Sequence, residues 1–280
     1  MIRFLQPDDA LFSSPAYDRD RTAFDLLEVI RRAPLLLAGD GTSFAAGRNL
    51  PGMPAWLWTA DEIAAPVLEE AAAMALDRLA EGDTLRVVAK PQAADSIAQY
   101  IAARRTITAH SRLRMRAFVN PRPRPPRNRT ACIERPTRAD LPALAACMAG
   151  FARECFGETP EADALLRRAE AALDNPLLLV VREAGEIAAM ACCTRETARH
   201  CAISQVYTRP LSRGRGYAAA LAAELSGRIL SLGKTPMLYA NVDNHAAVRA
   251  YESVGFTPCG RVDELALRWE ESARGKRENA

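Results

Sequence analysis

The most constraining feature of this sequence is a strand-like run followed by a glycine-punctuated, basic turn and then by a helix-like run. Residues 206–208 (Val-Tyr-Thr) favour a strand, and Pro210 ends it. The alanine- and leucine-rich residues 218–232 have helical composition. A chain with this order turns sharply from a strand into the start of a helix, which is typical of α/β folds.

The turn has the chemistry of an anion site. The first N–H groups of a helix lack internal partners and lie at the positive end of its dipole, so they can hold a diphosphate. Gly214 and Gly216 let the main chain approach such a group closely. Arg213 and Arg215 could add charge-assisted hydrogen bonds. The sequence therefore predicts that a diphosphate-bearing ligand binds at this turn.

Two motifs resemble those of the GNAT superfamily of acyl-CoA N-acyltransferases. Arg213-x-x-Gly216-x-Ala218 resembles the Q/R-x-x-G-x-G/A signature of that family. Residues 244–256, which read NHAAVRAYESVGF, resemble its N-x-x-A-x-x-x-Y-x-x-x-G-F segment. The resemblance covers about residues 130–270, roughly half of the chain. It implies an α/β fold whose sheet is mixed, as in α+β proteins. It also implies acetyl-CoA or another acyl-CoA as co-substrate.

The resemblance also implies which residues contact the donor. These residues lie on the strand, in the loop and in the second motif: Val206, Tyr207, Thr208, Arg213, Gly214, Arg215, Gly216, Tyr217, Ala218 and Asn244. In the family the pantetheine arm lies along the strand, so the Val206 N–H could polarise the thioester oxygen. Asn244 could contact the pantetheine, cap the helix that follows, or do both.

Tyr251 matches the family's tyrosine and is the candidate general acid. A phenol with an ordinary pKa near 10 stays protonated at neutral pH and can donate its proton to a departing thiolate. The alternative is a structural tyrosine whose ring packs between helix and sheet. The resemblance further implies a V-shaped gap between the strand at residue 206 and the strand at residue 237, with Tyr251 facing the gap.

The general base does not carry over from the family. Many members have a glutamate on the strand that leads to the loop, but the aligned residue here is Ala202. Side chains alternate along a strand, which would place His200 on the same face as Ala202 and Val206. His200 is therefore a candidate base, with a position at a solvated strand end as its alternative. Three glutamates could instead attract an ammonium substrate or be solvated: Glu154, Glu158 and Glu161.

The length of 280 residues suggests two domains. The first half repeats the expected order of elements of the second: a shift of 151 residues brings Tyr100 onto Tyr251. No arginine-glycine loop follows the strand at residues 55–59, however. We therefore predict a degenerate GNAT-like or accessory α/β domain at residues 1–119, an Arg/Pro-rich linker at 120–129, and a catalytic GNAT acetyltransferase domain at 130–280. The alternative for the first half is an unrelated α/β domain.

Residues 104–129 hold nine arginines and no acidic residue. A nucleic-acid or acidic-partner surface is one interpretation. No aromatic residues interleave the arginines as a stacking platform would require, so nucleic acid is the less favoured partner and a solvated strand followed by a stiff Pro-rich linker is favoured.

The composition is that of a globular protein, with 49% hydrophobic and 25% charged residues. No apolar run is long enough to span a membrane, so no membrane partner and a cytoplasmic location are expected. The seven cysteines form no C-x-x-C pair, and the three histidines have no zinc-ligand spacing. We expect no metal, and we read the cysteines as reduced, with metal or redox chemistry at Cys192 and Cys193 as the alternative.

The function predicted from these features is an acetyl-CoA-dependent N-acetyltransferase that acts on a small amine or an amino-acid-like acceptor. Two alternatives stay open: a protein or peptide N-acetyltransferase, and an acyl-CoA-binding sensor or scaffold without turnover, suggested by the missing glutamate. The acceptor, the acyl chain length and the oligomeric state, a homodimer included, are not readable from the sequence.

Overall fold

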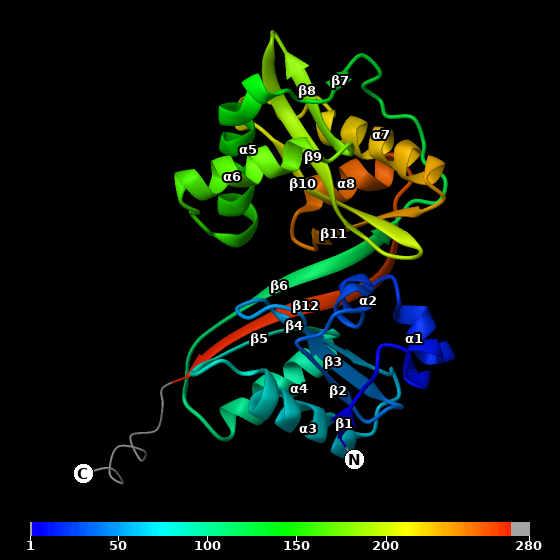
Figure 1. Ribbon diagram of the computed structural model, residues 1–280, viewed down its shortest axis with the longest axis vertical. Coiled ribbons are helices and arrows are strands. Elements are labelled where there is room, and N and C mark those ends of the chain that lie inside the picture. Colours follow the sequence, from blue (N-terminus) through cyan, green and yellow to red (C-terminus); the bar gives the residue numbers. More distant parts are fainter. Residues whose placement is uncertain (1, 270–280) are drawn as a thin grey trace, which may run out of the picture. The chain divides into compact units, whose positions relative to one another are not determined.

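The structure is a computed structural model that describes residues 2–269 (Figure 1). It divides into two compact units. The first contains the chain up to Ala117 together with the strand from Cys259 onward, and the second contains residues 118–258. Residues 270–280 of the predicted 130–280 domain lie outside the described residues.

The second unit is a mixed sheet covered by helices on both faces. Its elements in chain order are β7 (Cys132–Glu134), α5 (Leu141–Phe156), α6 (Ala162–Leu173), β8 (Leu178–Glu183), β9 (Glu186–Glu196), β10 (His200–Thr208), α7 (Tyr217–Ser231), β11 (Thr235–Asn241) and α8 (His245–Ser253). The strand order is β7-β8-β9-β10-β11, antiparallel except for the parallel pair β10 and β11. The predicted mixed α/β fold is confirmed.

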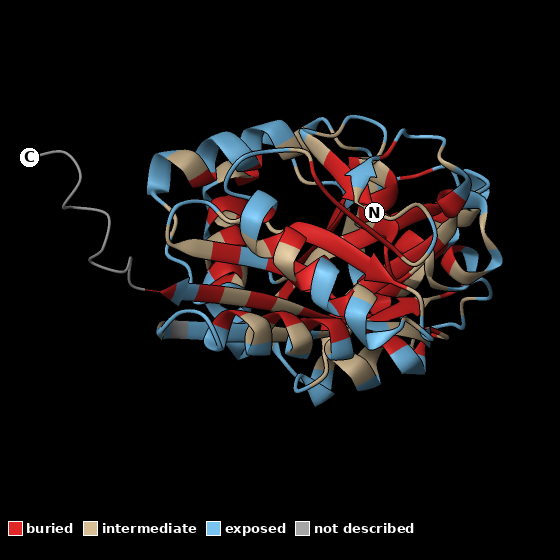
Figure 2. Ribbon diagram, turned by 90° about the horizontal axis from the view of Figure 1, so that it is seen from below, coloured by how far each residue is buried: buried red, intermediate tan, exposed pale blue. Residues whose placement is uncertain are grey.

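Helices bury both faces of this sheet, which explains why its strands read as continuous apolar runs. Residues 187–193 of β9 are all buried. In Figure 2, where buried residues are red, red is found on strands and on parts of the helices. Leu144 of α5 and Leu165 of α6 pack with Met190 on one face. Leu221 and Leu225 of α7 pack with the other face.

The first unit repeats this architecture with its own elements. These are β1 (Arg3–Phe4), α1 (Pro15–Asp20), α2 (Asp25–Ile30), β2 (Leu36–Gly39), β3 (Phe44–Arg48), β4 (Ala55–Thr59), α3 (Ala65–Met74), β5 (Thr84–Ala89), α4 (Pro91–Ala102), β6 (Ile107–Val119, to Ala117 in this unit) and β12 (Thr257–Trp269, from Cys259 in this unit). The strand order is β1-β2-β3-β4-β5-β12-β6, and β4 and β5 are parallel. Two short helices, α1 and α2, lie between β1 and β2.

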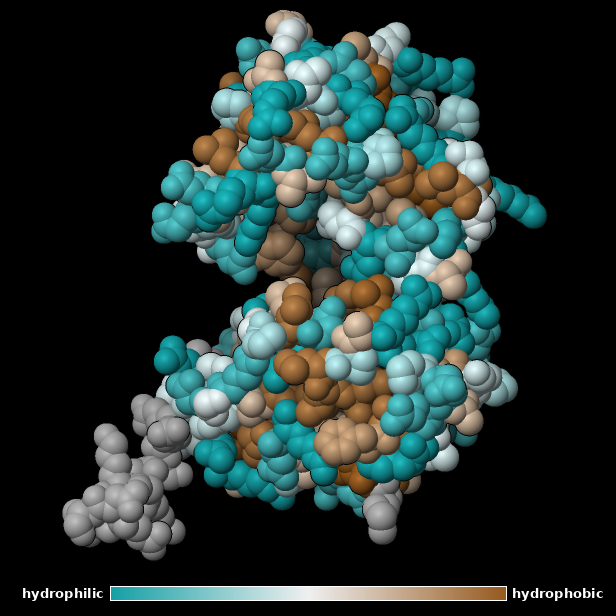
Figure 3. All heavy atoms as spheres, viewed as in Figure 1, coloured by the Kyte–Doolittle hydropathy of each residue, from teal (hydrophilic) through white to brown (hydrophobic). Residues whose placement is uncertain are grey.

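Aromatic side chains fill one face of the first unit's sheet at the end of β4. Trp58 is fully buried, contacts Tyr17 edge to face, and donates from Nε1 to Asp20 at 2.8 Å. Lys90, directly after β5, pairs with the same Asp20. On the face of this unit visible in Figure 3, hydrophobic side chains gather among polar ones, and its exposed large hydrophobic residues include Leu35, Leu50 and Met53.

The segment 120–129, expected to be a linker between domains, lies within the second unit. The N–H of Asn120 donates to the carbonyl of Pro236 at 2.9 Å, and the N–H of Arg124 donates to that of Val254 at 2.8 Å. The predicted end of the second domain also differs, because β12 pairs antiparallel with β5 of the first unit. Long-range strand pairing of this kind leaves no mark in local composition.

In the described part of the chain, no helix combines the length and apolar character that crossing a membrane requires. Over the same residues, no cluster of histidine, cysteine and acidic side chains has the arrangement of a metal site.

Candidate functional site

A cavity of about 480 Å³ lies in the second unit between the end of β10, the start of α7, α8 and the end of α5. It collects the candidate donor-binding residues and the candidate general acid, namely Val206, Tyr207, Thr208, Arg213, Gly214, Arg215, Gly216, Tyr217, Ala218, Asn244 and Tyr251. His200 is not among the residues that line it. The structure therefore brings together residues from two motifs that are far apart in the sequence.

The loop before α7 has the conformation that its glycines were expected to provide. Gly214 and Gly216 have φ angles of 78° and 79°, in the left-handed region that L-residues rarely adopt. Gly216 directly precedes α7, and the first helical N–H groups have no partner inside a helix. In the described residues, the N–H groups of residues 214–219 donate to no main-chain carbonyl. Several adjacent N–H donors of one loop are thus without a main-chain partner.

The strand that leads to the loop is irregular, and this changes which residues share a face. Its pairing with β9 shifts register between Ala202 and Ile203 and again between Ser204 and Tyr207. Gln205, in the second shift, has a φ of 51°. Val206 consequently packs with the cluster that contains Ile203. The simple alternation that placed His200 and Val206 on one face is wrong. The first shift leaves its extra residue on β9, whereas the second leaves one on β10 and so reverses the direction of the β10 side chains that follow.

The pairs between β10 and β11 run from His200 with Thr235 to Ala202 with Met237, and no later pair joins these strands in the described residues. Val206 and Thr208 lie beyond the last pair and line the cavity. This is the gap between the two strands that the family resemblance implied. Among residues 2–269 no helix fills this gap, and the cavity is lined by both Val206 and Tyr251.

Both loop arginines are ion-paired. Nη2 of Arg213 lies 2.7 Å from both carboxylate oxygens of Glu154, and its Nε donates to the carbonyl of Thr208 at 3.1 Å. The hydrogen bond with Glu154 raises the pKa of Arg213. Arg215 pairs with Glu183. The positive charge expected for a diphosphate is therefore partly compensated, and main-chain N–H groups remain as the uncommitted donors.

The α5 wall of the cavity was missing from the predicted donor site. Phe151, Glu154 and Cys155 line it; Glu154 was expected either to attract an ammonium substrate or to be a solvated side chain. The helix approaches β10 closely at Gly150, where an added Cβ would lie 2.3 Å from the Tyr207 hydroxyl oxygen. A glycine that faces the donor strand from the middle of an otherwise alanine-rich helix is the signal that could have identified this wall.

Tyr251 is 6% exposed and lines the cavity. Burial, with a smaller contribution from Cys155, raises the pKa of its hydroxyl above the ordinary value near 10. Its ring also contacts Phe256 edge to face, with centroids 5.9 Å apart. Tyr251 thus packs in the core and also reaches the cavity, so the two interpretations of this residue are compatible.

Asn244 caps α8, because its Oδ1 accepts a hydrogen bond from the Ala247 N–H at 3.0 Å. The capping role is confirmed, and the side chain also lines the cavity. His200, in contrast, is buried at the far end of β10. Val206 lies six positions farther along β10, roughly 20 Å in an extended strand, so His200 does not lie beside the groups that line the cavity.

A narrow gap between parallel strands, a glycine loop at a helix start and a protonated tyrosine are the parts of a site for a diphosphate-linked thioester. Three features fit such a ligand: the free main-chain N–H groups of the loop, the end of β10 that does not pair with β11, and the cavity that connects both to Tyr251. The fold and the site are those of the acetyltransferase class, as the comparisons with known proteins also indicate.

Residues 144–256 match the model of the acetyltransferase (GNAT) family, and this part of the chain belongs to that family. Solved structures are similar over most of the chain. A GCN5-related N-acetyltransferase from Sphaerobacter thermophilus matches with a TM-score of 0.61 and 17% identity over 97% of this chain and 96% of that chain. A GCN5-related N-acetyltransferase from Kribbella flavida matches with a TM-score of 0.59 and 15% identity over 93% of this chain and 99% of that chain.

A GNAT-family acetyltransferase from Colwellia psychrerythraea gives a TM-score of 0.55 and 13% identity over 96% of this chain and 100% of that chain. At these identities the likeness concerns the fold alone. Among curated proteins, none matches this chain at a significant level.

Proposed function

We propose that the second unit is an acetyl-CoA-dependent N-acetyltransferase whose acceptor is the amine of a small molecule or an amino-acid-like compound. The observation that carries this proposal is the single cavity in which the N–H groups of the glycine loop, the unpaired end of β10 and Tyr251 meet. A donor of another shape would not need all three together.

Different parts of the site bind different parts of the donor. The N–H groups of residues 214–219 hold the diphosphate at the positive end of α7. Main-chain groups of Val206 and Thr208 bind the pantetheine arm as a strand would, and the Val206 N–H stabilises charge on the thioester oxygen. The acyl thioester supplies an activated carbonyl carbon, and the neutral acceptor amine attacks it.

Tyr251 supplies the proton for the departing thiolate. Its raised pKa keeps it protonated over the range in which amines become neutral. The base stays unassigned to any side chain: Ala202 occupies the family's glutamate position, and His200 lies away from the cavity. The acceptor can bind as the neutral amine that is already present at equilibrium, or water can accept the proton from the amine.

For the first unit we propose a degenerate GNAT-like lobe without a donor site. Shifting its elements by 151 residues places β5 at 235–240, on β11, and α4 at 242–253, on α8. Just beyond the last β4–β5 pair, which joins Leu57 and Ala89, Trp58 is buried and its Nε1 donates to Asp20. These side chains support a lobe without a donor site.

The test is calorimetric titration of the full chain with acetyl-CoA, followed by measurement of thiol release with a panel of small amines and short peptides. Saturable binding with turnover on small amines supports the proposal. Turnover on peptides alone would mean that the acceptor is a peptide or protein amine. Binding of acetyl-CoA without any turnover would mean that the protein is a sensor or scaffold. Absence of binding by folded protein overturns the donor assignment.

A further inference from the structure

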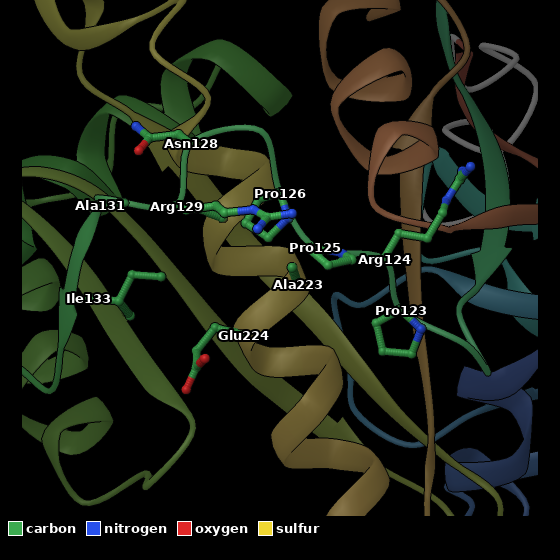
Figure 4. Close-up of a pocket in the computed structure, with 11 residues that line it drawn as sticks. Pro123, Arg124, Pro125, Pro126, Asn128, Arg129, Ala131, Ile133, Ala223 and Glu224 are labelled. Atoms are coloured by element: carbon green, nitrogen blue, oxygen red, sulfur yellow. The ribbon is translucent and has the colours of Figure 1, made fainter.

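A second cavity, of about 490 Å³, lies along α7 in the same unit (Figure 4). One wall is the proline-rich segment that includes Pro125 and Pro126, and the floor is the α7 face that bears Ala220 and Ala223. The arginine-proline run of the sequence, which the donor site did not explain, therefore encloses a space of its own.

This cavity adjoins the diphosphate loop. Nδ2 of Asn128, one of its lining residues, donates to the carbonyl of Arg215 at 2.8 Å. A Cβ placed on Gly216 would lie 3.3 Å from the Cβ of Asn128. Along α7, Ala223 follows Gly216 by seven residues, about 10 Å of helix. A group bound in the cavity would be continuous with one bound at the loop.

The charges in the cavity are separated. The Arg129 side chain extends across α7 toward Pro126 (Figure 4) and has no hydrogen-bond or ion-pair partner among the described residues. Arg124 instead points toward α8, where it donates to the carbonyl of Glu252. Glu224 lies farther along α7 and pairs with Arg228 at 2.8 Å. One cationic group and one anionic group thus flank an apolar floor.

We infer that this cavity binds the adenosine 3′-phosphate end of the acyl-CoA donor, with Arg129 pairing the 3′-phosphate. The alanines and prolines offer flat apolar surfaces for a purine, and the Glu224 carboxylate can accept from its exocyclic amine. An arginine is suited to phosphate because its fork of donors matches the phosphate oxygens. This inference rests on the proposed function, since the diphosphate at α7 sets where the nucleoside begins.

The alternative occupant is a single-stranded nucleic acid, which the arginines alone would also attract. The lining lacks an aromatic side chain on which successive bases would stack. A single nucleotide held between prolines and alanines needs no such platform, and the connection to Arg215 ties the cavity to the donor loop. The observations therefore favour the donor's own nucleotide.

The experiment compares acetyl-CoA with 3′-dephospho-acetyl-CoA by titration calorimetry in three proteins: wild type, Arg129→Gln and Arg127→Gln. Arg127 is exposed, belongs to the same segment and does not line the cavity, so it controls for general charge. We expect the wild type and Arg127→Gln to prefer acetyl-CoA by about tenfold, and Arg129→Gln to bind both ligands equally. Ala223→Leu, which fills the floor, should weaken acetyl-CoA binding in the folded protein.

Equal binding of the two ligands by the wild type would overturn the inference while leaving the donor assignment intact. Equal loss of preference in both arginine variants would also overturn it, because general charge would then explain the effect. A short single-stranded oligonucleotide that binds the wild type more tightly than acetyl-CoA would replace the assigned ligand. Failure of the wild type to bind acetyl-CoA would overturn the proposed function itself.

Discussion

Glu154 holds Arg213 through both of its carboxylate oxygens, each 2.7 Å from Nη2 of the arginine. The pair lies in the donor cavity, and both side chains are partly exposed, at 42% and 48%. A diphosphate bound at the loop would compete with Glu154 for the same guanidinium. The ion pair therefore opposes donor binding instead of assisting it.

Replacing Glu154 with glutamine should raise the affinity for acetyl-CoA. Exposed ion pairs contribute about 0.2 to 1 kcal/mol, so releasing Arg213 should lower the dissociation constant, measured by calorimetry, by roughly 1.4- to 5-fold. Glu158→Gln is the matched control, because Glu158 is exposed and does not line the cavity. A weaker affinity in Glu154→Gln would show that the carboxylate supports the donor site.

The two loop glycines should be sensitive to alanine for a backbone reason. With φ near 78°, Gly214→Ala meets no neighbouring atom but strains the chain, at a cost of about 1 to 2 kcal/mol. We expect at least a fivefold loss of acetyl-CoA affinity. Gly227→Ala, in the exposed middle of α7, should leave binding unchanged and raise the free energy of unfolding by about 0.5 to 1 kcal/mol. Equal binding by all three proteins would contradict the role of the loop.

Tyr251→Phe separates catalysis from binding. Loss of a general acid predicts a fall in kcat of about 10²- to 10⁴-fold with donor affinity retained. Because burial raises the pKa of Tyr251, the wild-type rate should not decline until the pH exceeds about 10. A decline that begins near pH 8, or an unchanged kcat in the variant, would remove Tyr251 from the mechanism.

Much of this fold was predictable from the sequence because its signals are local. The helices at 141–156 and 217–231 follow apolar periodicity, and the strands of the second unit are apolar runs between turns. The donor loop was predictable because its backbone adopts positive φ angles, which favour glycine, and glycines are visible in the sequence. These elements depend on residues near one another in the chain.

The predictions failed where the structure depends on contacts between residues far apart in the sequence. The register shifts in β10 depend on its fit against β9, and they invalidated the alternation that made His200 a neighbour of Val206. The Glu154–Arg213 pair joins residues 59 apart in the sequence. The assignment of β12 to the first unit depends on pairing with β5. None of these relations leaves a periodic pattern along the chain.

Gly150→Ala should destabilise the second unit through Tyr207. The added methyl would lie 2.3 Å from the tyrosine hydroxyl and 2.4 Å from Cζ, closer than any tolerated contact. We expect a loss of about 1 to 3 kcal/mol in the free energy of unfolding and a weaker affinity for acetyl-CoA. The same change in a Tyr207→Ala background should cost much less, because the clash is gone. An equal cost in both backgrounds would exclude this contact as the cause.

Acid should weaken the first unit through Glu28. Burial alone would raise the pKa of this carboxyl, but hydrogen bonds from Arg31 and Tyr17 outweigh it and lower the pKa. The stabilisation is therefore present above the unfolded pKa near 4.3 and is lost as the pH falls through the lower, folded value. Glu28→Gln should lose at least about 2 kcal/mol at pH 7 and show a flatter dependence below pH 5.

Tryptophan fluorescence measures this effect selectively, because all three tryptophans (Trp56, Trp58 and Trp269) lie in the first unit. Asp18→Asn is the control. Asp18 is half exposed and pairs with Arg21, which also pairs with Glu28, yet its replacement should change the stability by less than about 0.5 kcal/mol. A steeper acid dependence in Glu28→Gln than in the wild type would contradict the assignment.

The irregular β10 strand also bears on how this protein can change over time. Its first residues are held by β9 and β11 together, whereas the stretch after Gln205 is held by β9 alone. The main-chain groups from Val206 to Thr208 are therefore positioned by a single neighbouring strand, and their other edge is left open to a ligand. Changes on β9 would reach that edge more directly than changes on β11.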